Sequence, residues 1–484
     1  MTRHDAGARG WAEDEFGDAK LGHAARSRRL ATMSSRAASH PAGKISEVFT
    51  VDAERQGAYD FLEDGRITPK MLADASVAAS VSRAREHSFV FVAVDGSSLT
   101  FTDRSGKKDL GAVGTPEFGC RGLKVMTGYA CDPRGVPVGV LGQSWWKRTQ
   151  APKTKRAEKR KRAAKRAPSE KETQHWIDVI HATTDVLRDS GTMAWFQLDR
   201  EGDSAAVLKE LAASGRWFTV RSSTNRRLCR DSTSKPKRKD VERIYLRETL
   251  AKKKVVGTYS LQVPRGPKRT GRVARMSARV AKVVLRFRHY WTKQITTFEV
   301  TAVWVKETSH VPNGEKRIDW LLFTNREVRT FEDAQLVLRG YATRWRIEEL
   351  HKTWKSGACH VEDAQLHSMS ALVKWSTILL AVATRIERLK QLARQTPDAP
   401  AGQEFTPAEL RALLYLKKKY KKRNETIVDN PTIGLAVRWV AELGGYTGKS
   451  SGGPPGSITI GRGLRDLLVV ASVIEDFPEK RRRK

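Results

Sequence analysis

The sequence predicts an α/β protein in which a sheet-forming middle region is flanked by helical regions at both ends. Two runs of β-branched and aromatic residues, 88–94 and 193–198, have the composition of buried strands. Apolar residues recur at helical spacing near the N-terminus and again after residue 365. The length of 484 residues corresponds to two to four domains. We expect a helical region over 1–68, an α/β region over 69–365 and a helical region over 366–484.

Composition indicates a protein that binds a polyanion. The formal net charge is +35 and the pI is about 10.2, which is typical of nucleic-acid-binding proteins. Hydrophobic residues make up 39% of the chain, so it can still build cores. No apolar run reaches membrane-spanning length and the polar N-terminus lacks the apolar segment of a signal peptide, so we expect no membrane partner and a cytoplasmic location.

The first 68 residues contain two helical patterns, from Glu13 to Leu30 and near Val51 to Leu62. Aromatic side chains in this region are expected to be core residues: Trp11, Tyr59 and Phe61. Basic side chains lie between and within the helices and are either DNA-phosphate contacts or parts of an ordinary exposed face: Arg26, Arg28, Arg29 and Lys44.

The middle region begins with three predicted strands. The run 88–95 ends in Asp95, and Gly96 with the two serines after it is expected to break the strand. Strands at 122–131 and 136–146 follow, joined by a turn at Asp132-Pro-Arg-Gly. The run 193–198 then ends in Asp199. This order is similar to an RNase H-like sheet.

Two basic features accompany the strands. Residues 147–172 contain twelve Lys and Arg side chains, which indicate either a DNA-contacting loop or a generic basic patch. Between about 215 and 325 strand-like runs alternate with basic turns at 235–239 and 265–269. Those turns are either DNA contacts or solvated hairpin tips.

A helix-length segment over 341–355 places four chemically active side chains on one face, since their spacings are 3, 4 and 7: Tyr341, Arg344, Glu348 and Lys355. Ligands collect at strand ends in open α/β sheets, so Asp95, Asp199 and Glu348 are expected to converge. Their oxygens suit two Mg²⁺ ions, or Mn²⁺, which hold a phosphodiester between them. The four cysteines include no CxxC pair, which disfavours zinc and disulfides.

The chain resembles the DDE transposases of bacterial insertion sequences, in the cut-and-paste, hairpin-forming branch similar to the Tn-five transposase. Tyr-x2-Arg-x3-Glu-x6-Lys is the branch signature, and Asp199-Arg-Glu-x-Asp203 matches the surroundings of the second catalytic aspartate. The resemblance implies an RNase H-like catalytic core with an inserted β-rich subdomain, a helical N-terminal domain that recognises element ends, and a helical C-terminal dimerisation domain. It also implies end nicking, hairpin formation and opening, and strand transfer into target DNA.

The same resemblance implies further site residues. Asp95, Asp199 and Glu348 would be the catalytic metal ligands, and Trp320 would stack on a flipped base. The remaining side chains implied to contact DNA are Tyr341, Arg344, Lys352, Lys355 and Arg221. On sequence alone, a Trp beside Leu321-Leu-Phe is more often a core residue, and only the resemblance assigns the stacking role to Trp320.

The C-terminal region begins with apolar residues at helical spacing from Leu366 to Leu389. That face packs either on the catalytic region or between protomers, and the resemblance implies a homodimer that holds two DNA ends in a synaptic complex. Helices at 407–422 and 431–443, a Gly/Ser/Pro-rich segment and a basic tail follow. Two alternatives stay open: an RNase H-like nuclease that cuts without joining, and a non-catalytic, DNA-binding transposase remnant that acts as an inhibitor.

Overall fold

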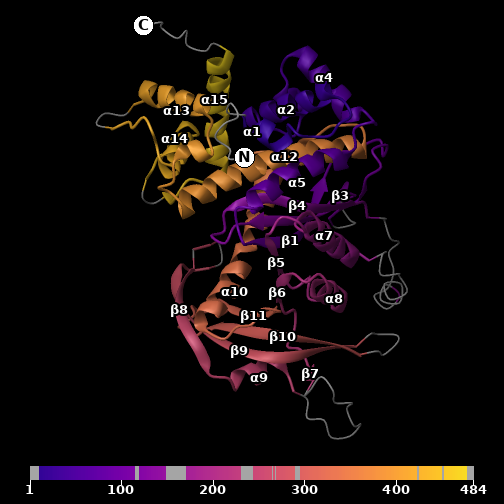
Figure 1. Ribbon diagram of the computed structural model, residues 1–484, viewed down its shortest axis with the longest axis vertical. Helices are drawn as coiled ribbons and strands as arrows, with labels where there is room; N and C mark the ends of the chain where they lie inside the picture. Colours follow the sequence, from indigo (N-terminus) through magenta and orange to yellow (C-terminus); the bar gives the residue numbers. More distant parts are fainter. Residues whose placement is uncertain are drawn as a thin grey trace.

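The computed structural model describes residues 10–114, 119–148, 158, 171–229, 244–263, 265–266, 269–288, 295–421, 425–449 and 452–476. A long mixed sheet occupies the middle and one end of the molecule, and the N- and C-terminal helices lie together at the other end (Figure 1). Most of the basic run 147–172, the turn 235–239 and the basic tail lie outside the described residues.

The N-terminal helices are α1 (Trp11–Phe16), α2 (Ala24–Ser39), α3 (Ile45–Val48), α4 (Asp52–Glu63) and α5 (Pro69–Ala84). The single helical pattern predicted over 13–30 is therefore two helices. Gly17 caps α1, and Gly22 adopts a φ of +77°, which ends any continuous helix there. The helix predicted near 51–62 is confirmed as α4, and Trp11, Tyr59 and Phe61 pack in a core cluster as expected.

The first part of the sheet contains β1 (Phe89–Thr100), β2 (Gly111–Ala112), β3 (Arg121–Cys131), β4 (Pro137–Trp146), β5 (Met193–Leu198) and β6 (Trp217–Arg221). β3 lies antiparallel between β1 and β4, while β1, β5 and β6 run parallel. β1 alternates its side chains between two cores: Val90, Val92 and Val94 face α7 (Thr173–Val186) and α8 (Ala205–Ala213), whereas Ala93 faces the large helical core.

The predicted end of the first strand at Asp95 is wrong. β1 continues to Thr100 because Gly96 to Thr100 pair with Met126 to Gly122 of β3. Only the parallel pairing with β5 stops at this point, with Val94 opposite Leu198. Asp95 thus lies inside a strand, beside the end of its parallel neighbour.

The strands between 215 and 325 extend the same sheet. After β6, they are β7 (Leu228–Cys229), β8 (Val255–Val263), β9 (Arg272–Arg288), β10 (Ile295–Glu307) and β11 (Asp319–Thr324), with α9 (Leu246–Ala251) before β8. β11 pairs antiparallel with β6, and β10 and β9 follow outward, so eleven strands form one hydrogen-bonded sheet.

The segment predicted as one helix over 341–355 is divided. α10 (Phe331–Thr343) ends before Arg344, and α11 (Trp345–Lys355) begins after it. The Arg344 N–H bonds to the carbonyl of Tyr341, three residues back, so the α-helical ladder is interrupted there. Tyr341 consequently belongs to a different helix from Glu348.

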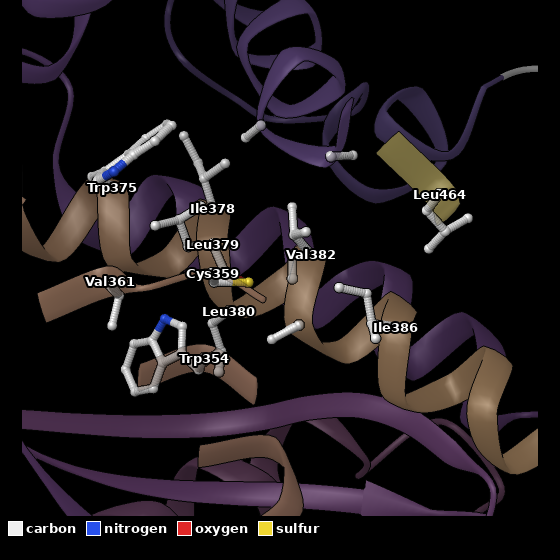
Figure 2. Packing of buried hydrophobic residues seen from close by; sticks show 14 of the residues in the cluster. Trp354, Cys359, Val361, Trp375, Ile378, Leu379, Leu380, Val382, Ile386 and Leu464 are labelled. Atoms are coloured by element: carbon white, nitrogen blue, oxygen red, sulfur yellow. The ribbon is translucent and has the colours of Figure 1, made fainter. Parts of the chain in front are cut away.

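The C-terminal helices surround α12 (Met369–Gln395), which confirms the apolar periodicity predicted from Leu366 onward. Along α12, Trp375, Ile378, Leu379, Val382 and Ile386 follow one another, with Trp354 of α11 on the side toward the sheet (Figure 2). The remaining helices are α13 (Pro407–Lys419), α14 (Ile433–Leu443) and α15 (Ser457–Asp476), with single turns η3 (Val361–Asp363) and η4 (Ala401–Gln403).

One core cluster joins α1 to α4 with α11 to α15, so residues from both ends of the chain share it. α12 is the one helix among the described residues that is long and apolar enough to cross a membrane, but 89% of its apolar window is buried inside the protein. The apolar residues of α12 are therefore accounted for by its position as a central core helix.

Candidate active site

Strand register brings two predicted site residues together. Val94 and Leu198 are the last paired residues of the parallel strands β1 and β5, and Asp95 and Asp199 follow them directly. Neighbouring strands lie about 4.8 Å apart, so the two aspartates lie side by side just after the parallel pairing of β1 and β5 ends. Asp199 Oδ1 accepts a hydrogen bond from the Glu201 N–H at 2.7 Å, which fixes its carboxylate in the turn before α8.

Arg344 links Glu348 to Asp95. Its Nη2 donates to Glu348 Oε1 at 2.8 Å, and its Nη1 lies 3.5 Å from Asp95 Oδ2. Nη1 is buried and has no hydrogen-bond partner among the described residues. The guanidinium therefore bridges the carboxylates of β1 and α11, and the Arg344 side chain is only 11% exposed.

The pKa of Asp95 is affected by both of the other carboxylates, Asp199 and Glu348. Burial, followed by the negative charge of Asp199, raises the pKa of Asp95 to about 6, and Glu348 adds to the shift. The Gly96 N–H and Arg344 act in the opposite direction without cancelling it. Crowded carboxylates with a perturbed pKa are typical of functional sites.

The three carboxylates do not form a preorganised metal cluster. Among the described residues, no group of three or more His, Cys, Asp or Glu side chains is arranged to hold a metal ion. Arg344 occupies the position between Asp95 and Glu348 and supplies the positive charge there.

Two family models match the chain outside this site. Residues 8–67 match the model described as transposase DNA-binding, and residues 381–476 match the model described as the transposase Tn5 dimerisation domain. These two matches support a Tn5-like transposase. The first match covers α1 to α4, and the second begins inside α12 and continues to the end of α15.

Outside the N-terminal region, the other side chains expected to contact DNA lie on β6, β11, α10 and α11. The Trp320 ring meets the Tyr341 ring edge to face at 5.5 Å, and Tyr341 is 5% exposed. Lys355 Nζ donates to the Ser98 carbonyl at 2.7 Å, which ties α11 to β1, whereas Lys352 is exposed. Arg221 Nη2 donates to the Asp319 carbonyl at 3.2 Å.

The three N-terminal arginines differ in availability. Arg26 is held inside the domain, because its Nη1 donates to the Leu21 carbonyl at 3.1 Å and its Nη2 lies 3.5 Å from Asp64. Arg28 and Arg29 are exposed on α2. The guanidinium of Arg29 lies so close to Gly57 that a Cβ there would approach it to 2.7 Å, which fits a glycine at this helix crossing.

Sequence reasoning missed the bridging position of Arg344 and the partners of Glu349. The spacing of Arg344 and Glu348, four residues apart, indicated that they share a face, but only the packing of α11 on β1 brings Asp95 to the same guanidinium. Glu349 points away from the carboxylate site and contacts Arg346, Lys390 and Gln391. No sequence pattern connected those residues.

Proposed function

We propose that this transposase is a DDE enzyme that moves its element by cut-and-paste transposition, with Asp95, Asp199 and Glu348 as the catalytic carboxylates. The observation that carries the proposal is geometric: strand register places Asp95 beside Asp199, and Arg344 bridges Asp95 and Glu348. The raised pKa of Asp95, caused first by burial and then by the charge of Asp199, agrees with this arrangement. The sheet order β4-β3-β1-β5-β6, antiparallel then parallel, supports an RNase H-like core. Strands β7 to β11 would then be the inserted β-rich part.

The donor set fits Mg²⁺, with Mn²⁺ as a substitute. Asp95, Asp199 and Glu348 offer hard oxygen ligands. Burial, followed by repulsion from Asp199, raises the pKa of Asp95, and bound cations would offset both effects by stabilising its carboxylate. Two ions held by these residues would supply activation of the attacking oxygen and stabilisation of the leaving oxygen. Arg344, which now bridges Asp95 and Glu348, would release them and bind a DNA phosphate as a bidentate fork.

The reaction proposed is phosphoryl transfer without a covalent enzyme intermediate. Water attacks the phosphodiester at the element end and frees a 3′-OH, which attacks the opposite strand to form a hairpin. A second water opens the hairpin, and the freed 3′-OH joins target DNA. Trp320, already against Tyr341, would stack on the base extruded at the hairpin step, while Lys352, Lys355 and Arg221 would hold neighbouring phosphates.

The two matched regions support the proposed partners. Residues 8–67 would bind the element ends in double-stranded DNA, with Arg28 and Arg29 as exposed phosphate contacts. Residues 381–476 would form the homodimer of the synaptic complex, in which α15 offers Val469, 43% exposed, and Val473, 53% exposed. The enzyme would act in the cytoplasm on nucleoid DNA.

The test is a cleavage and joining assay on a labelled duplex that carries the inverted repeats flanking the gene. Wild type, Asp199→Ala and a control, Asp189→Ala, are compared with Mg²⁺ or Mn²⁺. Asp189 is an exposed carboxylate before β5, so its removal should leave the products unchanged. We expect nicks, hairpins and joined products from wild type and control, and end binding without products from Asp199→Ala.

Other outcomes favour the alternatives. Cleavage without joining of a pre-cut end would identify a nuclease. Binding of the ends by all three proteins, with no cleavage under either ion, would identify a DNA-binding remnant.

A further inference from the structure

A buried polar network connects α11, α12 and α15 on the side of α11 that faces away from the carboxylate site. We name it the α11–α12–α15 network, and its members are Arg346, Glu349, Thr353, Glu387, Lys390, Gln391 and Ser457. Three of them are almost fully enclosed: the side chains of Lys390 and Glu387 are 6% and 2% exposed, and Gln391 is buried completely. Most polar atoms of the network are paired, but Gln391 Oε1 and Arg346 Nε are buried with no hydrogen-bond partner among the described residues.

Three residues of α11 belong to the network, and two of them, Glu349 and Thr353, one turn apart, contact α12. Glu349 Oε2 accepts from Arg346 at 2.8 Å and from Gln391 Nε2 at 3.3 Å, and its Oε1 lies 3.4 Å from Lys390 Nζ. Thr353 Oγ1 donates to Glu387 Oε1 at 2.5 Å. Because both contacts lie on one face of α11, they fix the rotation of the helix about its axis.

The opposite side of the network is Ser457, the first residue of α15. Its hydroxyl donates to Glu387 Oε1 at 2.6 Å and accepts from Lys390 Nζ at 3.0 Å. Lys390 Nζ also pairs with Glu387 Oε2 at 2.5 Å. One serine therefore contacts both members of the ion pair that holds α11.

The charges of the network balance, since two carboxylates, Glu349 and Glu387, face two cations, Arg346 and Lys390. Burial by itself would raise the pKa of Glu349, but Lys390 and Arg346 more than offset it and hold that pKa below its ordinary value. A buried ion pair contributes little net stability compared with well-packed apolar residues, because desolvation opposes the attraction. Its contribution is geometric, since each hydrogen bond tolerates little displacement.

Glu348, the carboxylate that faces Asp95 through Arg344, directly precedes Glu349. Glu387, Lys390 and Ser457 lie within the region that matches the dimerisation model. We propose that the α11–α12–α15 network positions Glu348 in response to the packing of the dimerisation region, so that the carboxylate site is aligned only when α15 is correctly seated. The inference rests on the proposed role of Glu348 as a catalytic residue.

Three variants test the coupling. Ser457→Ala removes the contact with α15 and leaves the buried ion pair intact, and Ser457→Thr retains the hydroxyl. The double variant Glu387→Gln with Lys390→Met removes one charge of each sign, so no uncompensated charge stays buried. The matched control is Lys417→Met with Glu442→Gln, which removes another buried ion pair of the C-terminal helices, between α13 and α14. Lys417 also pairs with Glu425, which is 22% exposed, and the structure gives neither carboxylate an ion pair with α11 among the described residues.

The measurements are end-DNA affinity, cleavage rate at saturating DNA, the Mg²⁺ concentration for half-maximal rate, and amide hydrogen exchange of residues 345–355. For Ser457→Ala we expect unchanged affinity, a cleavage rate about tenfold lower, a higher Mg²⁺ requirement, and exchange in α11 about fivefold faster, since small displacements of a catalytic group cost large factors in rate. Ser457→Thr should restore wild-type values, and the control should show none of these changes.

The proposal would be overturned if Ser457→Ala and the double variant Glu387→Gln with Lys390→Met both kept the wild-type cleavage rate, Mg²⁺ dependence and hydrogen exchange of α11. An equal loss in the control would also overturn it, because general softening of the C-terminal helices would then explain the effect. If wild-type protein does not cut DNA, the proposed function itself fails. Hydrogen exchange then still shows whether the network holds α11, since that measurement needs no catalysis.

Discussion

Replacing Asp95 with its neutral isostere should make the metal-free protein more stable at neutral pH. The pKa of Asp95 is raised from 3.8 to about 6, first by burial and then by the charge of Asp199. A carboxyl group with a raised pKa binds its proton more tightly in the folded state. The ionisation of Asp95 therefore lowers the free energy of unfolding progressively as the pH rises from about 4 to about 6, and by its full amount above pH 6. Asp95→Asn has no such ionisation.

The size of the effect follows from the shift. One pKa unit corresponds to about 1.36 kcal/mol, so a shift of roughly two units destabilises wild type by about 3 kcal/mol above pH 6. Since the Asp95 side chain is 21% exposed, solvent screening makes this an upper value. The unfolding free energies of the two proteins should coincide near pH 4 and diverge by about 2–3 kcal/mol at pH 7.5, with the variant more stable.

Urea unfolding in EDTA at several pH values measures this difference. Because all other titrating groups are common to both proteins, their contributions cancel in the comparison. Saturating Mg²⁺ should then narrow or reverse the difference, since an ion that binds only the folded wild-type site at a hundredfold excess over its Kd stabilises it by about 2.7 kcal/mol. A difference that is independent of pH would refute the electrostatic reasoning, and one that Mg²⁺ does not alter would refute the metal-binding role of Asp95.

Three further predictions concern separate parts of the molecule. Trp320→Ala should leave nicking intact but lower the hairpin yield about tenfold, because stacking of an extruded base contributes about 1–3 kcal/mol; gel analysis of the products checks this, and equal loss of nicking would argue against it. Val469→Asp combined with Val473→Asp should reduce dimerisation of the end complex without unfolding the protein, as sedimentation velocity would show; an unchanged dimer would place the interface elsewhere. Trp354→Ala should lower the unfolding free energy by about 3–5 kcal/mol, because the indole is fully buried beneath α12 and its N–H donates to the Ser376 carbonyl; denaturant unfolding measures it, and a loss below 1 kcal/mol would contradict the packing.

Local patterns predicted most of the regular elements. Apolar periodicity identified α4 and α12, and β-branched composition identified the strands that became β3 to β6. The errors arose where long-range pairing overrode a local signal. Gly96 reads as a strand end, yet β3 supplies hydrogen-bond partners through Thr100, and the even spacing from Tyr341 to Lys355 conceals the interruption at Arg344.

The sequence by itself determined the strand composition before Asp95 and Asp199, the spacing of Arg344 and Glu348, and the basic charge, because each depends on residues close together in the chain or on composition alone. Only the tertiary structure decided that Arg344 bridges Asp95 and Glu348, and that Lys390 connects α11 to α15. Only it decided that the two ends of the chain share a core around α12. The physical reason is that such contacts join residues tens to hundreds of positions apart, and no local periodicity records which buried surfaces will meet.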